Sequence, residues 1–205
     1  MKRRTGRILF ATSVAAMALL APAGTANAGL LSQSAGPCPN YASSKIFSRW
    51  LDPMNYTLAP GGNFESAAGL TLTGGAQIVA GNESFNVGSG GKSSVRLPRG
   101  ATVTTGPICV GLSKPTVRFF AKRPTFALLP LLTVEGLYVD KQGVTRSLPA
   151  VGVALAGNSW TPQLPFITTG ALLELGDTTM MRFRIRALSG DWQVDDFYVD
   201  PARRY

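Results

Sequence analysis

The stretch Met181-Arg182-Phe183-Arg184-Ile185-Arg186-Ala187 alternates strictly between apolar residues and arginines. Successive side chains of a β-strand point to opposite faces, so the apolar residues share one face and Arg182, Arg184 and Arg186 share the other. Residues 116–122 alternate in the same way, although less strictly. Strands with one apolar face are typical of antiparallel sheets that cover a core on one side. The two stretches therefore predict sheets that pack face to face.

The rest of the chain from residue 57 onward has the pattern of strands joined by turns. Short apolar or alternating runs are separated by clusters of Gly, Pro, Asn and Ser, and the 205 residues include 23 Gly and 14 Pro. No run sustains the spacing of an amphipathic helix over three turns. We predict strands over 70–73, 77–80, 94–97, 102–104, 108–110, 116–122, 131–139, 144–148, 172–175, 180–188 and 192–199.

These runs favour an all-β fold, an antiparallel β-sandwich or jelly roll, over residues 57–205. An irregular N-terminal segment over residues 29–56 precedes it and is rich in Ser, Pro and Asn. Within this segment, residues 44–51 could form one short helix with Ile46, Phe47, Trp50 and Leu51 on its apolar side.

Residues 1–28 have the three parts of a secretory signal peptide. A basic end over 2–7 is followed by a mostly apolar stretch over 8–20 and by the small-x-small pattern Ala26-Asn27-Ala28. The apolar stretch is shorter than the roughly 20 residues that a membrane-spanning helix needs. We expect a secreted, extracellular protein with no membrane span after cleavage; the alternative is an uncleaved N-terminal anchor.

The chain has two cysteines, Cys38 and Cys109. In an oxidising compartment they are the one pair available, and a disulfide between them would tie the N-terminal segment to the sandwich. Two separate buried thiols are the alternative. A redox-active pair is a weaker reading, because such cysteines usually lie close together in sequence, as in C-x-x-C.

Several classes of function are excluded or disfavoured by composition. The chain contains no histidine, so it cannot build a Ser-His-Asp triad, a Cys-His dyad or a His-ligated zinc site. A glycosidase needs two carboxylates in one cleft, and the sequence pairs none of its acids. The formal net charge of +9 is accompanied by no nucleic-acid recognition motif. The glycine-rich residues 88–93 lack the first glycine of a phosphate-binding loop and predict a hairpin loop. We expect neither an enzyme nor a nucleic-acid partner.

Two stretches carry a resemblance to a known type of module. Asn63-Phe64-Glu65 and the aromatic ending over residues 191–201 resemble jelly-roll carbohydrate-binding modules, the galactose-binding-like β-sandwiches. The chain after residue 28 is also similar to a family of uncharacterised secreted actinobacterial proteins, through Gly81-Asn82-Glu83, residues 118–121 and the same ending. That second resemblance implies a fold and a compartment but no activity.

The resemblance to the modules implies a structural calcium held by Glu65 and by Asp195 or Asp196. Calcium takes six to eight oxygen ligands, which two carboxylates, backbone carbonyls and water can supply. The strand alternation also breaks here, because residues 192 and 194 share one parity and residues 197 and 199 the other. A β-bulge at 195–196 would explain the change. The alternative is an exposed acidic pair that faces nearby arginines.

Two features could bind a ligand. Trp160 lies in a turn-rich stretch and is the aromatic residue we expect to be exposed for stacking on a sugar, unless it begins a core strand. Arg182, Arg184 and Arg186 could bind a polyanion such as a teichoic acid, or could form a solvated outer face. We predict a secreted, non-catalytic binding module for a glycan or an anionic cell-wall polymer. The alternative is a structural or surface-interaction protein without a small ligand.

Overall fold

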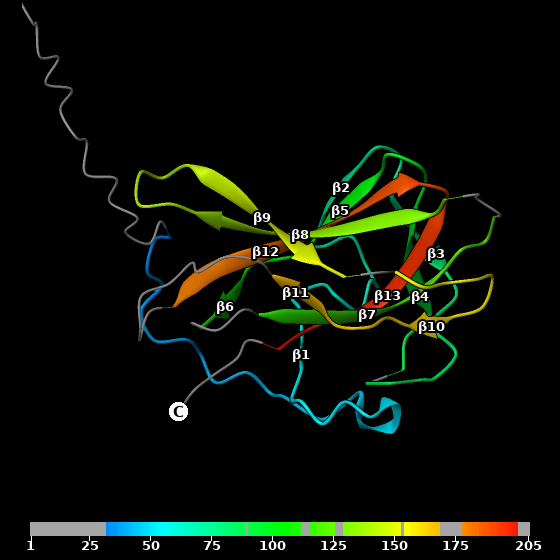
Figure 1. Ribbon diagram of the computed structural model, residues 1–205, viewed down its shortest axis with the longest axis horizontal. Helices are drawn as coiled ribbons and strands as arrows, with labels where there is room; N and C mark the ends of the chain where they lie inside the picture. Colours follow the sequence, from blue (N-terminus) through cyan, green and yellow to red (C-terminus); the bar gives the residue numbers. More distant parts are fainter. Residues whose placement is uncertain are drawn as a thin grey trace, which may run out of the picture.

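The computed structural model describes residues 32–88, 90–111, 115–125, 129–152, 154–168 and 178–200 (Figure 1). In these ranges, the chain forms strands and one short 3-10 turn. The elements are η1 (Ser48–Trp50), β1 (Thr57–Leu58), β2 (Thr71–Thr73), β3 (Gln77–Ala80), β4 (Ser93–Leu97), β5 (Thr102–Thr104), β6 (Ile108–Val110), β7 (Thr116–Lys122), β8 (Leu131–Val139), β9 (Thr145–Val151), β10 (Thr161–Pro162), β11 (Phe166–Thr168), β12 (Thr179–Ser189) and β13 (Trp192–Asp200).

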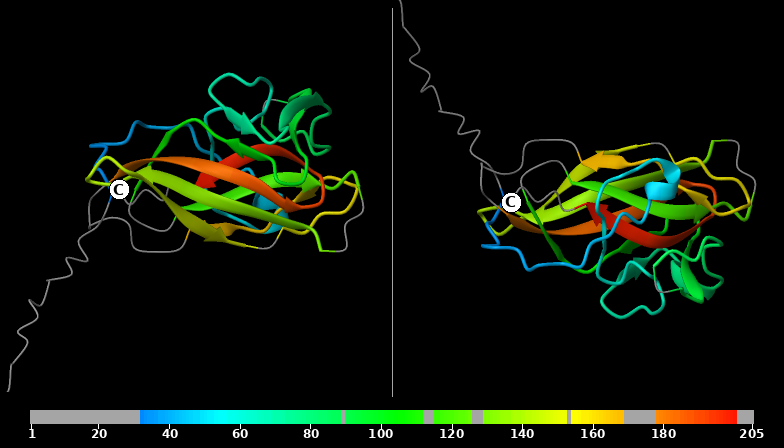
Figure 2. Two further views of the ribbon diagram at one scale, coloured as in Figure 1. Left: turned by 90° about the horizontal axis from the view of Figure 1, so that it is seen from above. Right: turned by 90° about the horizontal axis from the view of Figure 1, so that it is seen from below.

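Antiparallel pairing joins the strands into one path, β2-β5-β12-β8-β9-β11-β7-β13-β4-β3. The path folds over, so that β2, β5, β12, β8 and β9 form what we call the first layer (Figure 2). The strands β11, β7, β13, β4 and β3 form the second layer, with β1 and β10 at its margins. Across the layers, the rings of Phe183 and Phe197 lie 5.7 Å apart. The predicted antiparallel β-sandwich is therefore confirmed.

The alternation of β12 is the reason that it faces the core on one side. Met181, Phe183 and Ile185 are fully buried, whereas Arg182 and Arg186 are exposed. The burial of this apolar face against the second layer removes its side chains from water, which is the main favourable contribution to folding.

Every residue of β13 is buried, unlike those of β12. Its pairing with β7 shifts register between Asp195 and Tyr198, and Asp196 has a φ of +48°. This bulge returns Phe197 and Val199 to the core that also holds Trp192, and it confirms the break predicted from the alternation. Extra residues at a bulge re-aim side chains, here those of the two aspartates.

The N-terminal segment covers the outer face of the second layer (Figure 1). Phe47 is fully buried and packs with Tyr56, Phe120 and Tyr198. The predicted helix over 44–51 is reduced to the turn η1, and Leu51 is 95% exposed instead of facing the apolar side. Leu51 ends the turn in the left-handed region, with a φ of +61°.

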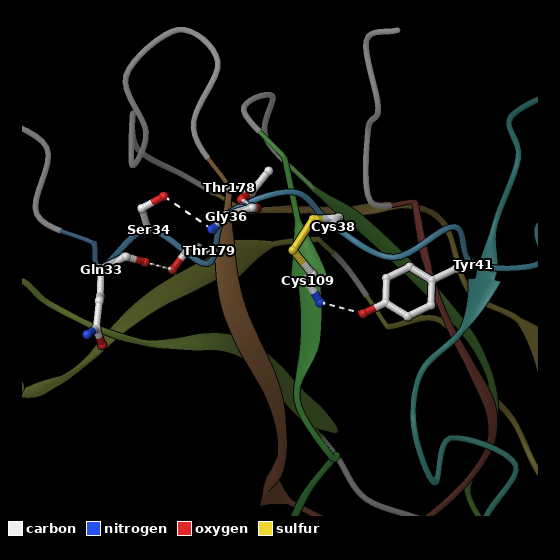
Figure 3. The surroundings of a disulfide bond; sticks show 8 residues. All are labelled: Gln33, Ser34, Gly36, Cys38, Tyr41, Cys109, Thr178 and Thr179. Carbon is white, nitrogen blue, oxygen red and sulfur yellow. Dashed lines mark hydrogen bonds between the residues drawn. A yellow bond between two sulfur atoms is a disulfide. The ribbon is translucent and has the colours of Figure 1, made fainter.

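The disulfide between Cys38 and Cys109 is present, as predicted. Figure 3 shows that the segment before it is also held by hydrogen bonds, with Thr179 Oγ1 donating to the carbonyl of Gln33 at 2.9 Å. The Cys109 amide donates to the hydroxyl of Tyr41 at 3.0 Å. These contacts connect the N-terminal segment to β6 and β12 at several points.

The short strands β1, β10 and β11 were not predicted, since two or three residues give no periodic signal. The predicted signal peptide over 1–28 and the predicted strand over 172–175 lie outside the described residues. Within the described ranges, no helix has the length and apolar character needed to cross a membrane.

Candidate functional site

The outward side of the first layer carries hydroxyls and arginines. The register places Thr104 of β5 opposite Arg184 of β12, and Arg184 opposite Glu135 of β8. The next outward row places Thr102 opposite Arg186. Strand β2 extends both rows with further threonines. We call the following side chains the arginine–threonine face: Thr71, Thr73, Thr102, Thr104, Thr133, Arg182, Arg184 and Arg186.

The three arginines of this face have different surroundings. Arg184 forms an ion pair with Glu135, while its Nε is buried and has no hydrogen-bond partner. Arg182 and Arg186 are exposed, and neither forms an ion pair with a described residue. Two exposed guanidinium groups therefore flank a third whose charge is compensated.

A groove of about 480 Å³ adjoins Arg182 on this face. Met180 and Arg182 line it from β12, Leu137 and Tyr138 from β8, and Thr71 and Thr104 from the neighbouring strands. Its lining, as far as the described chain goes, includes no carboxylate. The groove thus combines a cation, hydroxyls and apolar walls.

Trp160 is not part of this face. It lies immediately before β10, in the second layer, and packs partly buried against the cluster around Phe47. The Nζ of Lys122 lies 4.6 Å from the centre of its ring. The turn-rich sequence around Trp160 gave no indication of the pairing between β10 and β7. The structure therefore does not bring Trp160 together with the three arginines.

A second group of predicted residues lies at the bulge of β13. Glu65 Oε1 accepts hydrogen bonds from the backbone amides of Lys92 and Ser93, at 2.8 and 2.9 Å. Asp195 accepts from the amides of Glu83 and Asp196, at 2.7 and 2.9 Å. Asp195 thus holds the loop between β3 and β4 against β13, and Glu65 holds the start of β4 against the segment that precedes β2.

Glu83 also belongs to this group, although it was not among the predicted metal ligands. Its carboxylate accepts hydrogen bonds from the amides of Phe85 and Val87, and its side chain is buried. Its place in Gly81-Asn82-Glu83 was the available signal, but the contact with Asp195 spans 112 positions in the chain. The contact is therefore apparent from the folded structure and not from the sequence.

Asp196 differs from the other acids of the group. It is 6% exposed, and its carboxylate forms no hydrogen bond or ion pair with another described residue. Burial raises the pKa of Asp196 to about 7, with the negative charges of Glu83 and Glu65 adding to the effect. Burial also raises the pKa of Asp195 to about 8, against the lowering effect of its two amide donors. Each buried negative charge is thus costly without a cation or a proton.

The oxygens near Asp196 are suited to a hard cation. A Cβ on Gly91 would lie 2.3 Å from Glu65 Oε1 and 2.4 Å from Asn82 Oδ1, so both oxygens converge on this glycine. In the described part of the chain, no three His, Cys, Asp or Glu side chains are grouped as metal ligands. A calcium ion here would therefore need amide and backbone oxygens beside Glu65 and Asp196, a mixture that calcium accepts.

No protein-family model and no curated protein matches the chain. Among solved structures, the family 22 carbohydrate-binding and GH10 modules of Clostridium thermocellum endo-1,4-β-D-xylanase 10B, complexed with xylohexaose, match with 14% identity and a TM-score of 0.51. The match covers 70% of this chain and 28% of that chain. A family 22 xylan-binding domain matches with 14% identity and a TM-score of 0.47, over 75% of this chain and 99% of its own.

A family 22 xylan-binding domain from Paenibacillus barcinonensis matches with 14% identity and a TM-score of 0.45, over 67% of this chain and 90% of that chain. The likeness to the Clostridium thermocellum structure shows a shared fold. The resemblance to jelly-roll carbohydrate-binding modules, inferred from the sequence, is thereby confirmed at the level of the fold. The similarity to uncharacterised secreted actinobacterial proteins stays a prediction.

Proposed function

We propose that the chain is an extracellular, non-catalytic binding module whose ligand is a carbohydrate polymer that carries negative charge. The observation that carries this proposal is the arginine–threonine face, where Arg182 and Arg186 are exposed among threonine hydroxyls and form no ion pair with a described residue. Residues four apart on a strand are separated by about 13 Å, so the two cations can contact two anionic groups spaced along one polymer.

The chemistry of the face favours an anionic glycan over a neutral one. Guanidinium groups bind carboxylate and phosphate oxygens through paired hydrogen bonds, and threonine hydroxyls can donate to and accept from sugar hydroxyls. The groove beside Arg182 has one aromatic lining residue, Tyr138, and it is 5% exposed. Stacking on a sugar ring is therefore a minor contribution, and charge is the main one.

The absence of a carboxylate from the described lining of this groove supports a non-catalytic role. Hydrolysis of a glycosidic bond needs two carboxyl groups on either side of the bond. The nearest acid on the face, Glu135, is engaged in the ion pair with Arg184. The fold shared with part of a structure whose carbohydrate-binding and GH10 modules are complexed with xylohexaose supports carbohydrate as the ligand class.

Binding to immobilised wall teichoic acid and to polygalacturonate, with neutral xylan as the comparison, tests the proposal. We expect the double variant Arg182→Gln/Arg186→Gln to bind both polyanions about tenfold more weakly, and affinity to fall with added salt. The control Lys45→Gln/Lys92→Gln removes two exposed charges from elsewhere and should bind normally. If wild type binds none of these polymers, the chain is instead a structural or surface-interaction protein. An affinity that does not change with added salt would contradict the role of the arginines.

We also propose that the group around the β13 bulge holds a structural calcium ion through Glu65, Asp196 and Asn82. The support is the largely buried Asp196, whose carboxylate has no hydrogen-bond or ion-pair partner among the described residues, and the convergence of the Glu65 and Asn82 oxygens. The ion would offset the repulsion among these acids. Melting in calcium and in EGTA, with Asp196→Asn as the variant, tests this. We expect calcium to raise the wild-type melting temperature and leave that of Asp196→Asn unchanged; equal wild-type temperatures would contradict the site.

A further inference from the structure

A second groove lies in the other layer, between the N-terminal segment and β7. Its volume is about 480 Å³. Arg118 and Thr116 line it from β7, and Asp52 and Tyr56 line it from the N-terminal segment. This groove exists because that segment covers the second layer, and it shares no lining residue with the groove beside Arg182.

Arg118 is held rigidly at this groove. It is 3% exposed, its Nε donates to the carbonyl of Gln163 at 2.8 Å, and its Nη1 donates to Asp52 Oδ2 at 2.7 Å. Its guanidinium carbon also lies 4.2 Å from the centre of the Phe47 ring. The remaining terminal nitrogen, Nη2, has no hydrogen bond to any described residue.

Arg118 lines the groove, and the hydrogen bonds of its Nε and Nη1 fix the plane of its guanidinium group. The N–H groups of Nη2 are therefore held in place as donors for a ligand oxygen in the groove. A donor fixed in place before binding loses little conformational entropy when the ligand arrives.

A fixed acceptor lies beside this donor. Asp52 Oδ2 accepts from the hydroxyl of Tyr56 at 2.8 Å as well as from Arg118. Among the described residues, the Met54 amide is the one donor to Asp52 Oδ1, at 3.1 Å, which leaves a lone pair for a ligand. Arg118 offsets the charge of Asp52, and Asp200 also lines the groove, so the lining disfavours an anionic ligand.

The rim of the groove is apolar and open to solvent. Leu51 is 95% exposed, Met54 51% and Leu164 57%, and all three line the groove. Large apolar side chains that gather around one opening mark a binding site. The groove therefore requires a ligand with one donor, one acceptor and an apolar end.

We propose that this groove binds the N-acetyl group of an N-acetylhexosamine in a glycan. The acetamido carbonyl accepts from Arg118 Nη2, its N–H donates to Asp52 Oδ1, and its methyl group packs against Leu51, Met54 and Leu164. An extended peptide would need a row of backbone partners along a strand edge. This groove offers side chains from the face of β7, which suits a single compact amide.

Calorimetry with the secreted chain and chitotetraose tests the proposal, with cellotetraose as the comparison because it has a hydroxyl in place of each acetamido group. We expect chitotetraose to bind at least tenfold more tightly. A peptidoglycan glycan tetrasaccharide forms the second arm, since N-acetylhexosamines occur in both polymers. Binding of either acetylated sugar supports the proposal, and binding of neither, or equal binding of cellotetraose, overturns it.

Variants locate the site without disturbing the buried Arg118. Leu51→Ser and Leu164→Ser change exposed rim residues and should weaken chitotetraose binding at least fivefold. Leu155→Ser is the matched control, because Leu155 is 58% exposed and does not line the groove. Arg182→Gln/Arg186→Gln should leave this binding unchanged. Loss of chitotetraose binding in that double variant, with normal binding by the rim variants, would place the sugar on the other layer and refute the inference. The outcome is independent of polyanion binding.

Discussion

Phe47→Ala is the substitution that tests how the N-terminal segment is attached. Phe47 is fully buried, and its ring lies 5.2 to 5.9 Å from those of Trp50, Tyr56, Phe120 and Tyr198. Removal of a buried phenylalanine side chain costs about 3–5 kcal/mol, depending on how far the surroundings collapse. The guanidinium of Arg118 also loses the ring that it contacts at 4.2 Å, which adds roughly 0.5–2 kcal/mol.

Partial collapse reduces this cost. The backbone amides of Ser44 and Tyr56 donate to each other's carbonyls at 3.0 and 2.9 Å, so the loop between them can settle inward as a unit. We therefore expect Phe47→Ala to lower the free energy of unfolding by about 4 kcal/mol. Urea denaturation followed by tryptophan fluorescence measures the change.

Phe47→Leu provides the comparison, since it keeps an apolar side chain in the cluster and should cost less than half as much. Limited proteolysis distinguishes local from global effects, because detachment of the segment would expose residues 44–56 to cleavage in the native state. A loss below about 1 kcal/mol, with no new cleavage, would refute the view that this segment is part of the folded core.

Three further predictions concern the disulfide, the buried acids and the glycines. Cys38→Ser/Cys109→Ser removes a cross-link between residues 71 positions apart. The chain-entropy model predicts that the free energy of unfolding, measured by chemical denaturation, falls by about 4 kcal/mol. The two aspartates of the β13 bulge have pKa values raised above 3.8, to about 8 and about 7. The calcium-free native state therefore binds protons that the unfolded chain has lost, and stability should fall from pH 5 to pH 8, by up to about 1.4 kcal/mol per pH unit for each proton. A free energy of unfolding that rises from pH 5 to pH 8 would contradict these raised pKa values. Gly62→Ala places a Cβ 2.5 Å from a backbone oxygen and should lower the free energy of unfolding by about 1–3 kcal/mol. The Cβ of Gly157→Ala meets nothing within 4 Å, so this variant should be neutral or slightly stabilising in the same denaturation assay.

The long strands could be predicted from sequence because one face of each has an uninterrupted period of two. Strand β12 follows this rule over its length, and the change of parity in β13 located its bulge at Asp195 and Asp196. The strands β1, β10 and β11 could not be predicted, since their pairing depends on neighbours placed by the rest of the fold. Local sequence determines the face of a long strand but not the partner of a short one.

The candidate sites likewise combine features that local sequence predicts with features that depend on the rest of the fold. The outward position of Arg182, Arg184 and Arg186 follows from periodicity, but the ion pair with Glu135 depends on the register of β8 against β12. Arg118 follows the same alternation in β7, which predicts an exposed side chain. It is buried instead because the N-terminal segment covers that face, bringing Asp52 from 66 positions away.

The difference in burial between the two layers limits what each can bind. The outer face of the second layer is covered by the N-terminal segment and by the loop between β3 and β4, so β13 is buried throughout and a compact groove lies beside the N-terminal segment. The outer face of the first layer has no such cover over β12, whose residues alternate between buried and exposed along most of its length. A polymer that contacts several strands can therefore lie only across the first layer, among the described parts of the sandwich, while the second layer can accept a single projecting group. If a bound polymer were found to protect the face of β13 instead of that of β12 from solvent exchange, the N-terminal segment would have to leave its place, and Phe47 would lose its burial.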